Sequence, residues 1–320
     1  MCHEVIHRIG HPVFYLPDGV ETAGHLCLKS WRICIGLVLM IAVAVGQAAE
    51  PVVGPLHESG FDGYIQQQQL AYQSFDRWPG VRVKRLGGDA ETGRLALYAE
   101  FPAGFHLPGG LESDKSIELL MLDGSLRLGD QWLTVFDFAF IPPGLELPQL
   151  ESDQISHALV FFDPASADPV ALQNQQSRGH YVRKYSEDDW EPAALAKSAG
   201  AQIDLKIFHL KKDPDTSARS WLVKLDGDMK VPWEVHSMAE EGYLLEGGYV
   251  LAECLPGRTV IGEYRQGGYF WRPGGIPHSG PESGPVGRVI WLQRSPVALD
   301  VVFYRGCENG QARDPVKAAG

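Results

Sequence analysis

The stretch E-V-H-S-M-A-E-E-G-Y-L-L-E-G, residues 234–247, and the stretch P-G-G-I-P-H that ends at His278 carry the most informative pattern in this sequence. Glu234 and His236 are two residues apart, so they share one face of an extended strand. Glu240 follows four residues after His236, and His278 comes from a distant turn. Separated His and carboxylate groups of this kind assemble metal sites on β scaffolds. The pattern therefore predicts a metal site formed by these four side chains.

The composition bounds the fold and the partners. The chain has 320 residues, of which 44% are apolar and 21% charged, so it is long enough for two globular domains. Its 36 glycines and 22 prolines favour many turns, and short runs rich in β-branched and aromatic residues lie between them. This combination predicts an all-β architecture. The net charge of -12 argues against nucleic acid as a partner, because a phosphate-binding face needs clustered Lys and Arg.

Residues 1–48 read as a leader that contains a signal peptide. Lys29 and Arg32 precede an apolar run from Ile33 to Val45, and the small residues around Ala48 offer a cleavage site for signal peptidase. The run is short for a membrane span and ends in polar sequence. We therefore expect a periplasmic or secreted mature protein with no membrane contact after cleavage. A retained N-terminal anchor is the alternative.

Two cysteines remain after that cleavage, Cys254 and Cys307, because the other three lie in the leader. In an exported chain they could form one disulfide. The sequence equally allows both to stay unpaired, with Cys254 buried in a strand, because it does not give their separation.

The spacing of apolar, turn-forming and charged residues along the chain predicts two β modules and two short helices. Tyr64, Gln68, Tyr72 and Phe75 fall near helical spacing, so a helix is expected there. Ser186 precedes three acidic residues and would cap a second helix that runs to about Lys197. The expected segments are a leader (1–48), an N-terminal segment (49–80), a first barrel (81–165), a linker with a short helix (166–200), a second barrel (201–306) and a flexible tail (307–320).

An internal repeat relates the two modules. Gly124 follows L-M-L-D in the first module, and Gly247 follows Y-L-L-E in the second. Each module then reaches a proline-glycine turn, at Pro142-Pro143-Gly144 and at Pro273-Gly274-Gly275. Repeats of this kind indicate two tandem copies of one β unit.

The second copy resembles the cupin superfamily, whose first motif contains H-x-H-x-x-x-E, six residues and a glycine. His236, Glu240 and Gly247 stand at the spacing of that motif. The second cupin motif reads G, five residues and P-x-G-x-x-H, which matches Gly267 through His278. The resemblance spans roughly residues 81–306 and implies two tandem cupin-like jelly-roll barrels.

Two positions depart from the cupin pattern. Glu234 stands where the family has its first histidine, and Glu282 stands where an asparagine often ends the second motif. Whether Glu234 replaces the missing histidine as a ligand or serves as a general base stays open.

The first copy is degenerate. In the register of the repeat, the four ligand positions are occupied by Leu111, Ser113, Ile117 and Leu147. None of these side chains is a metal ligand, so the first barrel is expected to be a structural partner. A different polar site is the alternative, from the nearby acidic residues Glu112, Asp114, Glu118 and Glu146.

The ligand types limit the metal. Imidazole nitrogens and carboxylate oxygens suit first-row divalent ions, so we expect one Zn, Fe, Mn or Ni ion. If Glu234 is not a ligand, a His-Glu-His set remains with open positions for water or substrate. The alternative is that His236 and His278 are surface turn histidines without a metal.

Other side chains carry weaker expectations. Glu241 points to the opposite strand face from Glu240, so it should be exposed or in an ion pair. The lone histidines His106, His157 and His209 are expected to be structural. Residues that could line a pocket are Tyr243, Tyr264, Trp271, Arg272 and Arg294.

These observations give three functional hypotheses. The first is a metal-dependent enzyme of dioxygenase, decarboxylase or isomerase type that acts on a small oxygenated molecule. The second is a binding or sensing module similar to the cupin domains of bacterial anti-sigma factors, and the third is a structural bicupin without an occupied site. A small-molecule ligand is the expected partner, and exposed strand edges make a homodimer reasonable.

Overall fold

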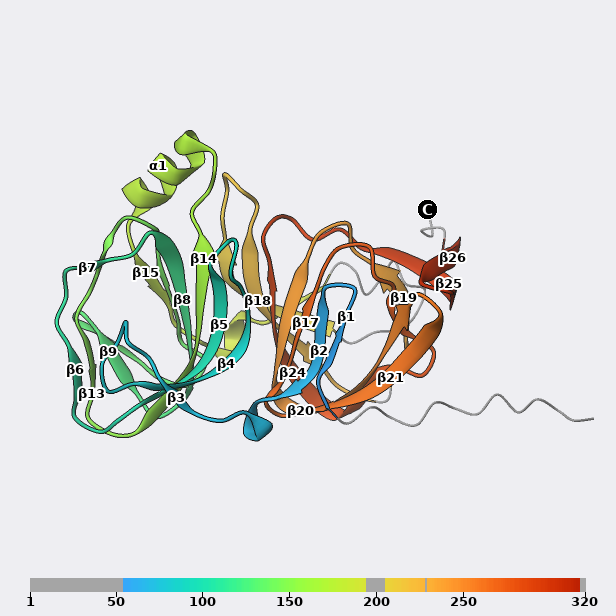
Figure 1. The fold of residues 1–320 in the computed structure, drawn as a ribbon, viewed down its shortest axis with the longest axis horizontal. Helices are drawn as coiled ribbons and strands as arrows, with labels where there is room; N and C mark the ends of the chain where they lie inside the picture. Colours follow the sequence, from blue (N-terminus) through green and yellow to red (C-terminus); the bar gives the residue numbers. More distant parts are fainter. Residues whose placement is uncertain (1–53, 194–204, 228, 317–320) are drawn as a thin grey trace, which may run out of the picture. The chain divides into compact units, whose positions relative to one another are not determined.

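The computed structural model describes residues 54–193, 205–227 and 229–316, all within one compact unit of the chain, Ala48–Gly320 (Figure 1). The predicted signal peptide lies outside these residues. No helix in the part that the structure describes is long and apolar enough to span a membrane.

Antiparallel sheets of seven, four and two strands form the first barrel. They run in the orders β15-β11-β8-β14-β5-β4-β3, β10-β9-β13-β6 and β12-β7. Their bounds are β3 (Gln73–Ser74), β4 (Arg82–Asp89), β5 (Arg94–Phe101), β6 (Phe105–Leu107), β7 (Leu111–Glu112), β8 (Lys115–Asp123), β9 (Leu126–Leu128), β10 (Gln131–Leu133), β11 (Phe138–Ile141), β12 (Glu146–Leu147), β13 (Leu150–Ser152), β14 (Ser156–Pro164) and β15 (Tyr181–Arg183).

One sheet of 13 strands forms the second barrel. Its path is β16-β17-β18-β24-β20-β23-β19-β25-β26, with β1, β2, β21 and β22 attached beside it. The bounds are β1 (Leu56–Glu58), β2 (Phe61–Gln66), β16 (Glu191–Pro192), β17 (Leu205–Lys212), β18 (Arg219–Leu225), β19 (Val231–Val235), β20 (Glu240–Leu255), β21 (Arg258–Arg265), β22 (Gly268–Arg272), β23 (His278–Gly280), β24 (Gly284–Ser295), β25 (Val302–Glu308) and β26 (Gln311–Pro315).

Strands between the two barrels are buried on both faces. In β14, Val160 packs into the core of the first barrel, whereas Leu159 and Phe161 belong to a cluster that also contains residues of the second barrel. On β24, Leu292 belongs to the same shared cluster, whereas Trp291 packs in the core of the second barrel. Successive side chains of a strand point to opposite faces. A strand that serves two cores therefore reads as a continuous apolar run.

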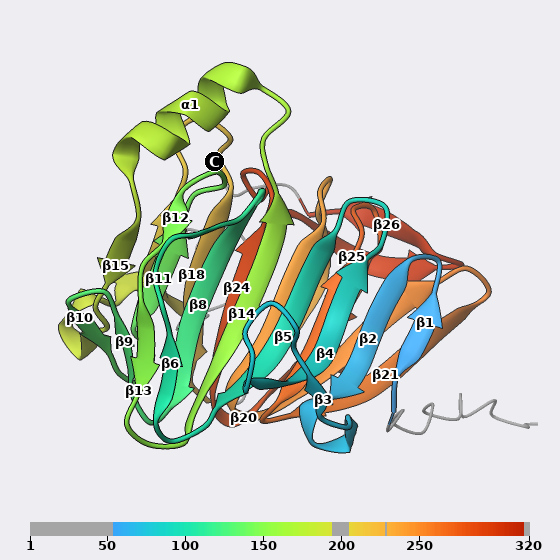
Figure 2. The same cartoon turned by 60° about the vertical axis from the view of Figure 1, so that its left-hand side comes forward.

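The predicted helix near Tyr64 is wrong. Residues 61–66 form strand β2, and only Gln67–Gln69 make one turn of 3-10 helix. β2 pairs with β22, about 200 residues later in the chain, and Figure 2 shows β1 and β2 running along β21. Tyr64 is buried, and its hydroxyl donates to the Leu251 carbonyl oxygen at 2.8 Å. Long-range pairing with the second barrel overrides the local helical spacing.

The helix predicted after Ser186 is also largely wrong. Ser186 does cap the turn Glu187–Asp189 by accepting from the Asp188 amide, but the chain then enters β16; the rest of that prediction lies outside the described residues. The linker's helix is instead α1 (Pro169–Arg178), which the Asp168 side chain caps. An aspartate followed by a proline is a common helix start, so the sequence did contain this signal.

Strand pairing agrees with the register of the repeat. Glu234 pairs with His278 between β19 and β23, and Leu111 pairs with Leu147 between β7 and β12. The two leucines thus occupy the place of two predicted ligands. Gly247 has φ +84°, and a Cβ there would lie 2.2 Å from the Arg288 carbonyl oxygen, so the turn requires glycine.

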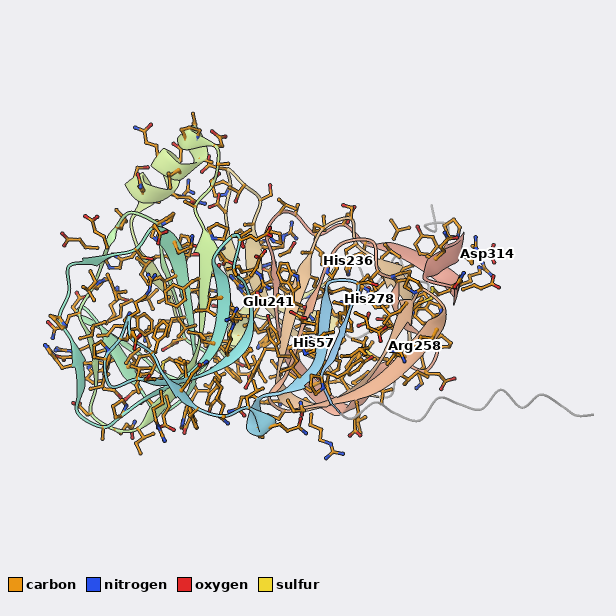
Figure 3. The ribbon with its side chains drawn as sticks, in the orientation of Figure 1. His57, His236, Glu241, Arg258, His278 and Asp314 are labelled. Carbon is orange, nitrogen blue, oxygen red and sulfur yellow. A yellow bond between two sulfur atoms is a disulfide. The ribbon has the colours of Figure 1, made fainter. Side chains whose placement is uncertain are left out.

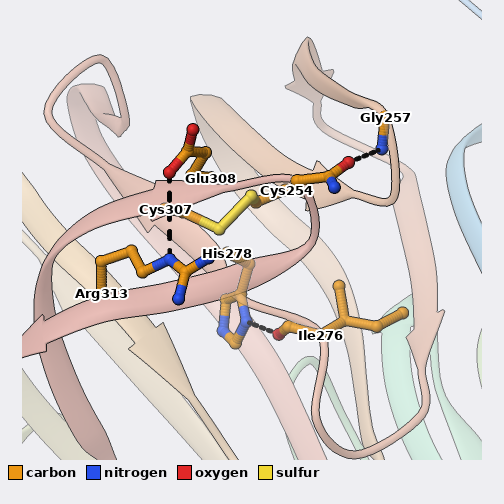
Figure 4. Close-up of a disulfide and its surroundings, with 8 residues drawn as sticks. Cys254, Gly257, Ile276, His278, Cys307, Glu308 and Arg313 are labelled. Carbon is orange, nitrogen blue, oxygen red and sulfur yellow. Dashed lines mark hydrogen bonds and ion pairs between the residues drawn. A yellow bond between two sulfur atoms is a disulfide. The ribbon is translucent and has the colours of Figure 1, made fainter.

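The two remaining cysteines pair. Cys254 on β20 and Cys307 on β25 form a disulfide, which answers the question that the sequence left open (Figure 4). The bond connects two strands of the second barrel, and β25 is hydrogen-bonded to β19, which carries Glu234.

Candidate metal centre

Three predicted ligands meet in the second barrel. Glu234 lies on β19, His236 follows the end of that strand, and His278 begins β23. One ligand atom from each lies within 4.8 Å of the other two, and this is the sole such group of three among the residues that the structure describes. Figure 3 shows both histidines inside the second barrel. Both are buried, so they are not surface turn histidines.

The two imidazoles are held with the same orientation. Nδ1 of His236 donates to the Asp300 carbonyl oxygen. Nδ1 of His278 donates to the Ile276 carbonyl oxygen at 3.1 Å, as Figure 4 shows. With Nδ1 protonated, each Nε2 keeps its lone pair. A backbone carbonyl behind Nδ1 is a common support for a metal-bound histidine. Both rings are therefore prepared to bind a cation through Nε2.

Carboxylate oxygens face these Nε2 atoms. The Glu234 Oε1 atom lies 3.4 Å from Nε2 of His278, and Glu240 Oε2 lies 3.7 Å from the same nitrogen. Glu240 Oε2 is also 3.8 Å from Nε2 of His236. Two imidazole nitrogens and the Glu234 carboxylate thus form a donor set suited to a first-row divalent ion, and Glu240 lies beside that group.

Glu240 has a second partner that the sequence did not predict. Arg272 is buried and donates to Glu240 Oε2, the oxygen that faces the imidazoles. The same guanidinium donates to both oxygens of Glu253, which is fully buried. Glu240 therefore lies beside the three-residue group, and its carboxylate also forms an ion pair with Arg272. Arg272 does line the pocket, as predicted.

Glu234 is kept ionised by its neighbours. Burial raises the pKa of the Glu234 carboxyl, but the hydrogen bond and charge of His278, the charge of His236 and the Ser279 hydroxyl outweigh it and bring the pKa to about 2. The Ser279 hydroxyl donates to Glu234 Oε1 at 2.8 Å. At neutral pH the carboxylate is therefore available as a ligand.

A cavity of about 180 Å³ opens onto these side chains, within the described part of the chain. Its walls are mainly apolar and aromatic. Besides the four predicted ligands and Arg272, the lining includes Ile207, His209, Trp221, Val223, Tyr249, Leu251, Phe270, Trp291, Gln293 and Phe303. Sequence reasoning missed His209 and Gln293. The alternation of strand faces could have pointed them inward, but only once the strand pairing was known.

Several predicted pocket residues lie elsewhere. Trp271 and Arg294 line a separate cavity of about 450 Å³, which also touches Glu118 of the first barrel. Tyr243 packs in the apolar cluster that both barrels share. Tyr264 belongs to the core of the second barrel.

The acidic residues Glu118 and Glu241 serve the contact between barrels. Arg294 donates to Glu118 Oε2 at 2.9 Å and also to Glu241. Lys211 adds a second cation to Glu118, and Arg94 donates to Glu241 at 3.1 Å. Glu241 is buried in an ion pair, which the sequence left as one of two options, and it lies between the two sets of strands in Figure 3.

No protein-family model and no curated protein matches the chain. Several solved structures do resemble it. A provisionally named glyoxylate-induced protein from Pseudomonas aeruginosa aligns with 18% identity and a TM-score of 0.57, over 78% of this chain and 93% of that one. A provisionally named dioxygenase from Nostoc punctiforme gives 15% identity and a TM-score of 0.52, over 77% and 86%. A variant of Bacillus subtilis oxalate decarboxylase gives 13% and 0.51, over 75% and 78%.

At these identities the likeness establishes the fold alone. The chain has the bicupin fold, two tandem cupin barrels in one polypeptide, as its two motifs predict. The predicted all-β jelly-roll architecture is confirmed.

Proposed function

We propose that this protein is a metal-dependent enzyme that acts on a small oxygenated molecule through the second barrel. One observation carries the proposal: Glu234, His236 and His278 converge on the wall of a cavity large enough for a small molecule. A closed structural metal site would leave no such space beside its ligands.

Each residue has a role in this proposal. His236 and His278 bind a Zn, Fe, Mn or Ni ion through Nε2, and Glu234 supplies a carboxylate oxygen. Glu240 completes the set while Arg272 fixes its orientation. The bound ion would supply Lewis acidity or a site for oxygen activation. Solved structures with this fold bear the names dioxygenase and oxalate decarboxylase, which supports reactions of these types.

A ligand-sensing module is the second candidate. Arg272 donates a hydrogen bond to the Glu240 oxygen that faces the imidazoles, so this oxygen is already occupied. A site that holds a ligand without transforming it does not need a free base. This favours binding alone, as in the cupin domains of anti-sigma factors.

Metal content and turnover separate these candidates. The full chain, purified without chelators, is compared with a His236→Ala/His278→Ala variant and with His106→Ala, a control at an exposed histidine of the first barrel. We expect about one metal ion per chain in the wild type and the control, and almost none in the double variant. Equal, negligible metal in all three would refute the site. Turnover of small oxygenated acids, screened in air and without oxygen, supports the enzyme; bound metal with no turnover supports the sensor.

Export and dimerisation belong to the same proposal. The disulfide between Cys254 and Cys307 supports an oxidising compartment. The mass of the mature protein tests export, because cleavage after Ala48 removes a defined leader. Size-exclusion chromatography with light scattering tests the homodimer.

A further inference from the structure

An arginine in the wall of the cavity has no partner. Arg219 is the first residue of β18, and it lines the cavity together with a second arginine, Arg272. Arg272 is held by Glu240 and Glu253. The half-buried side chain of Arg219 makes no hydrogen bond or ion pair with any residue in the described part of the chain, yet none of its nitrogens is among the inaccessible atoms that lack a partner. Its guanidinium is therefore open to a ligand.

Strand pairing sets Arg219 level with the candidate metal centre. Arg219 pairs with Ser295 on β24. On the other side of β24, Arg294 pairs with Glu241 of β20, so the same register continued by one residue brings Ser295 opposite Glu240. Directly paired residues of antiparallel strands project to the same face of a sheet. One strand therefore separates Arg219 from Glu240, which corresponds to two strand spacings, or about 10 Å between their backbones.

The face that these residues share is the inner face of the barrel. Arg219 and Trp221 are two residues apart on β18, so their side chains point to the same side of the strand. Trp221, Arg219 and Glu240 all line the cavity that holds the candidate ligands. The unpartnered cation and the candidate metal centre therefore face the same space.

Arg219 also touches the larger cavity between the barrels, where the other charges are already satisfied. Three cations there pair with three carboxylates, namely Arg94, Lys211 and Arg294 with Glu118, Asp163 and Glu241. A fourth carboxylate, that of Asp89, accepts from the Glu91 and Thr92 amides. The charge of Arg219 is therefore left for a ligand.

The charge of Arg219 also limits what that ligand carries. With both imidazoles neutral, Glu234, Glu240 and Glu253 contribute three negative charges and Arg272 contributes one positive charge. A divalent ion at the proposed site would cancel the remaining two. Arg219 then leaves one positive charge in the cavity wall, which a single carboxylate would neutralise. Guanidinium and carboxylate match in shape, because two parallel N–H···O bonds join them.

We propose that Arg219 binds the carboxylate of a small, singly charged acid whose second oxygen, a neutral hydroxyl or carbonyl, faces the metal position. This inference rests on the proposed function and names its class of substrate. Both side-chain arms take up part of the backbone separation of about 10 Å, so the acid has a short chain. The cavity, at about 180 Å³, is smaller than the roughly 300–1,000 Å³ of sites for drug-sized ligands, which agrees with such an acid.

Matched probes test both ends of the acid. The hydroxy acids are glycolate, 3-hydroxypropionate and 4-hydroxybutyrate, so that three lengths are sampled. Each is compared with its amide, which lacks the charge, and with acetate, propionate or butyrate, which lacks the second oxygen. Calorimetry on the zinc-loaded full chain measures each dissociation constant. We expect at least one hydroxy acid to bind about tenfold or more tightly than its amide, and more tightly than the acid without the hydroxyl.

Variants assign the preference for the acid to Arg219. In Arg219→Met the affinity for that hydroxy acid should fall about tenfold or more, while the affinity for its amide changes little. Arg219→Lys keeps the charge but loses the paired N–H groups, so its affinity should be intermediate. Arg265→Met, at an exposed surface pair, should bind as the wild type does. Zinc content equal to that of the wild type shows that each variant is folded.

Two results would overturn the proposal. The first is wild-type affinity for every acid in Arg219→Met, and the second is the absence of any preference for an acid over its amide in the wild type. Either result, obtained with zinc bound, leaves the proposed metal site intact.

Metal-free protein separates this inference from the proposed function. Without zinc, the hydroxy acid should lose its advantage over the acid without a hydroxyl, whereas the loss of affinity in Arg219→Met should persist. A wild type that binds no zinc would refute the proposed function, and the dependence on Arg219 would then be measured on the metal-free chain alone. An Arg219 effect with no zinc-dependent advantage of the hydroxyl would overturn the placement of the second oxygen and assign the acid to the cavity between the barrels.

Discussion

Reduction of the disulfide between Cys254 and Cys307 should destabilise the second barrel by an amount that follows from the chain. The two cysteines are separated by 53 residues. Closing a loop of that length removes about 14 cal/mol/K of entropy from the unfolded chain, which is about 4 kcal/mol at 25 °C. We therefore expect the free energy of unfolding to fall by up to about 4 kcal/mol on reduction.

Urea unfolding, followed by tryptophan fluorescence with and without a phosphine reductant, measures this change. A Cys254→Ala/Cys307→Ala variant is the control, because it should resemble the reduced wild type and should not respond to reductant. Identical denaturation midpoints for the oxidised and reduced wild type, with complete reduction verified by thiol titration, would refute the reasoning.

The same bond should affect the candidate metal centre. β25 carries Cys307 and pairs with β19, where Phe303 lies opposite Glu234. The Asp300 carbonyl oxygen, just before β25, accepts the Nδ1 proton of His236. Loosening β25 should therefore release the metal sooner, and extraction by a chelator should be faster in reduced protein than in oxidised protein.

Three further substitutions test the buried ion pairs between the barrels and the candidate metal centre. Arg294→Met leaves Glu118 and Glu241 buried with one cation fewer each, so the free energy of unfolding measured by urea titration should fall by about 3 kcal/mol. The control Arg265→Met removes an exposed surface pair and should cost less than about 1 kcal/mol. Equal losses in the two variants would contradict this role of Arg294. Burial raises the pKa of Glu118, but Arg294 and Lys211 outweigh it and hold the pKa well below its ordinary value of 4.5, so Glu118 stabilises the fold above that pH and the contribution is lost as the pH falls further. Unfolding measured between pH 7 and pH 3 should therefore show a weaker acid dependence in Glu118→Gln than in the wild type, and parallel curves would exclude this contribution. Glu234→Gln removes one negative charge from the candidate metal centre, so chelator competition should show at least about tenfold weaker metal binding. The control Glu263→Gln, on the surface, should leave the metal affinity unchanged. Unaltered affinity in Glu234→Gln would show that Glu234 is not a ligand.

Local sequence rules predicted the elements that local forces decide. The alternation of strand residues, the glycine at Gly247 and the proline-glycine turn before His278 depend on near neighbours and on backbone sterics. They were sufficient to predict an all-β repeat and to bring Glu234, His236 and His278 together. The register of the repeat also agrees with the strand pairing, because Leu111 pairs with Leu147 as Glu234 pairs with His278.

Features that depend on distant pairing could not be predicted in this way. β2 joins β22 across about 200 residues, and Arg294 meets Glu118 across 176. Arg272 looked like a possible pocket residue, but its ion pair with Glu240 depends on the register between β20 and β22. From a single sequence, the alternation of residues predicts which side chains lie on each face of a strand, but it does not predict which strands pair with each other.

The charges around the candidate metal centre favour a bound dication. Glu234, Glu240 and Glu253 contribute three negative charges in a largely buried region, and Arg272 contributes one positive charge. With both imidazoles neutral, the net charge is about -2, which is costly to bury because the effective penalty is several kcal/mol per uncompensated ion. A divalent cation between the imidazoles and the carboxylates would cancel it. The matching positions of the first barrel are uncharged, Leu111, Ser113, Ile117 and Leu147, so the imbalance is confined to the barrel that retained the ligands. This confinement argues that the second barrel is built around a cation.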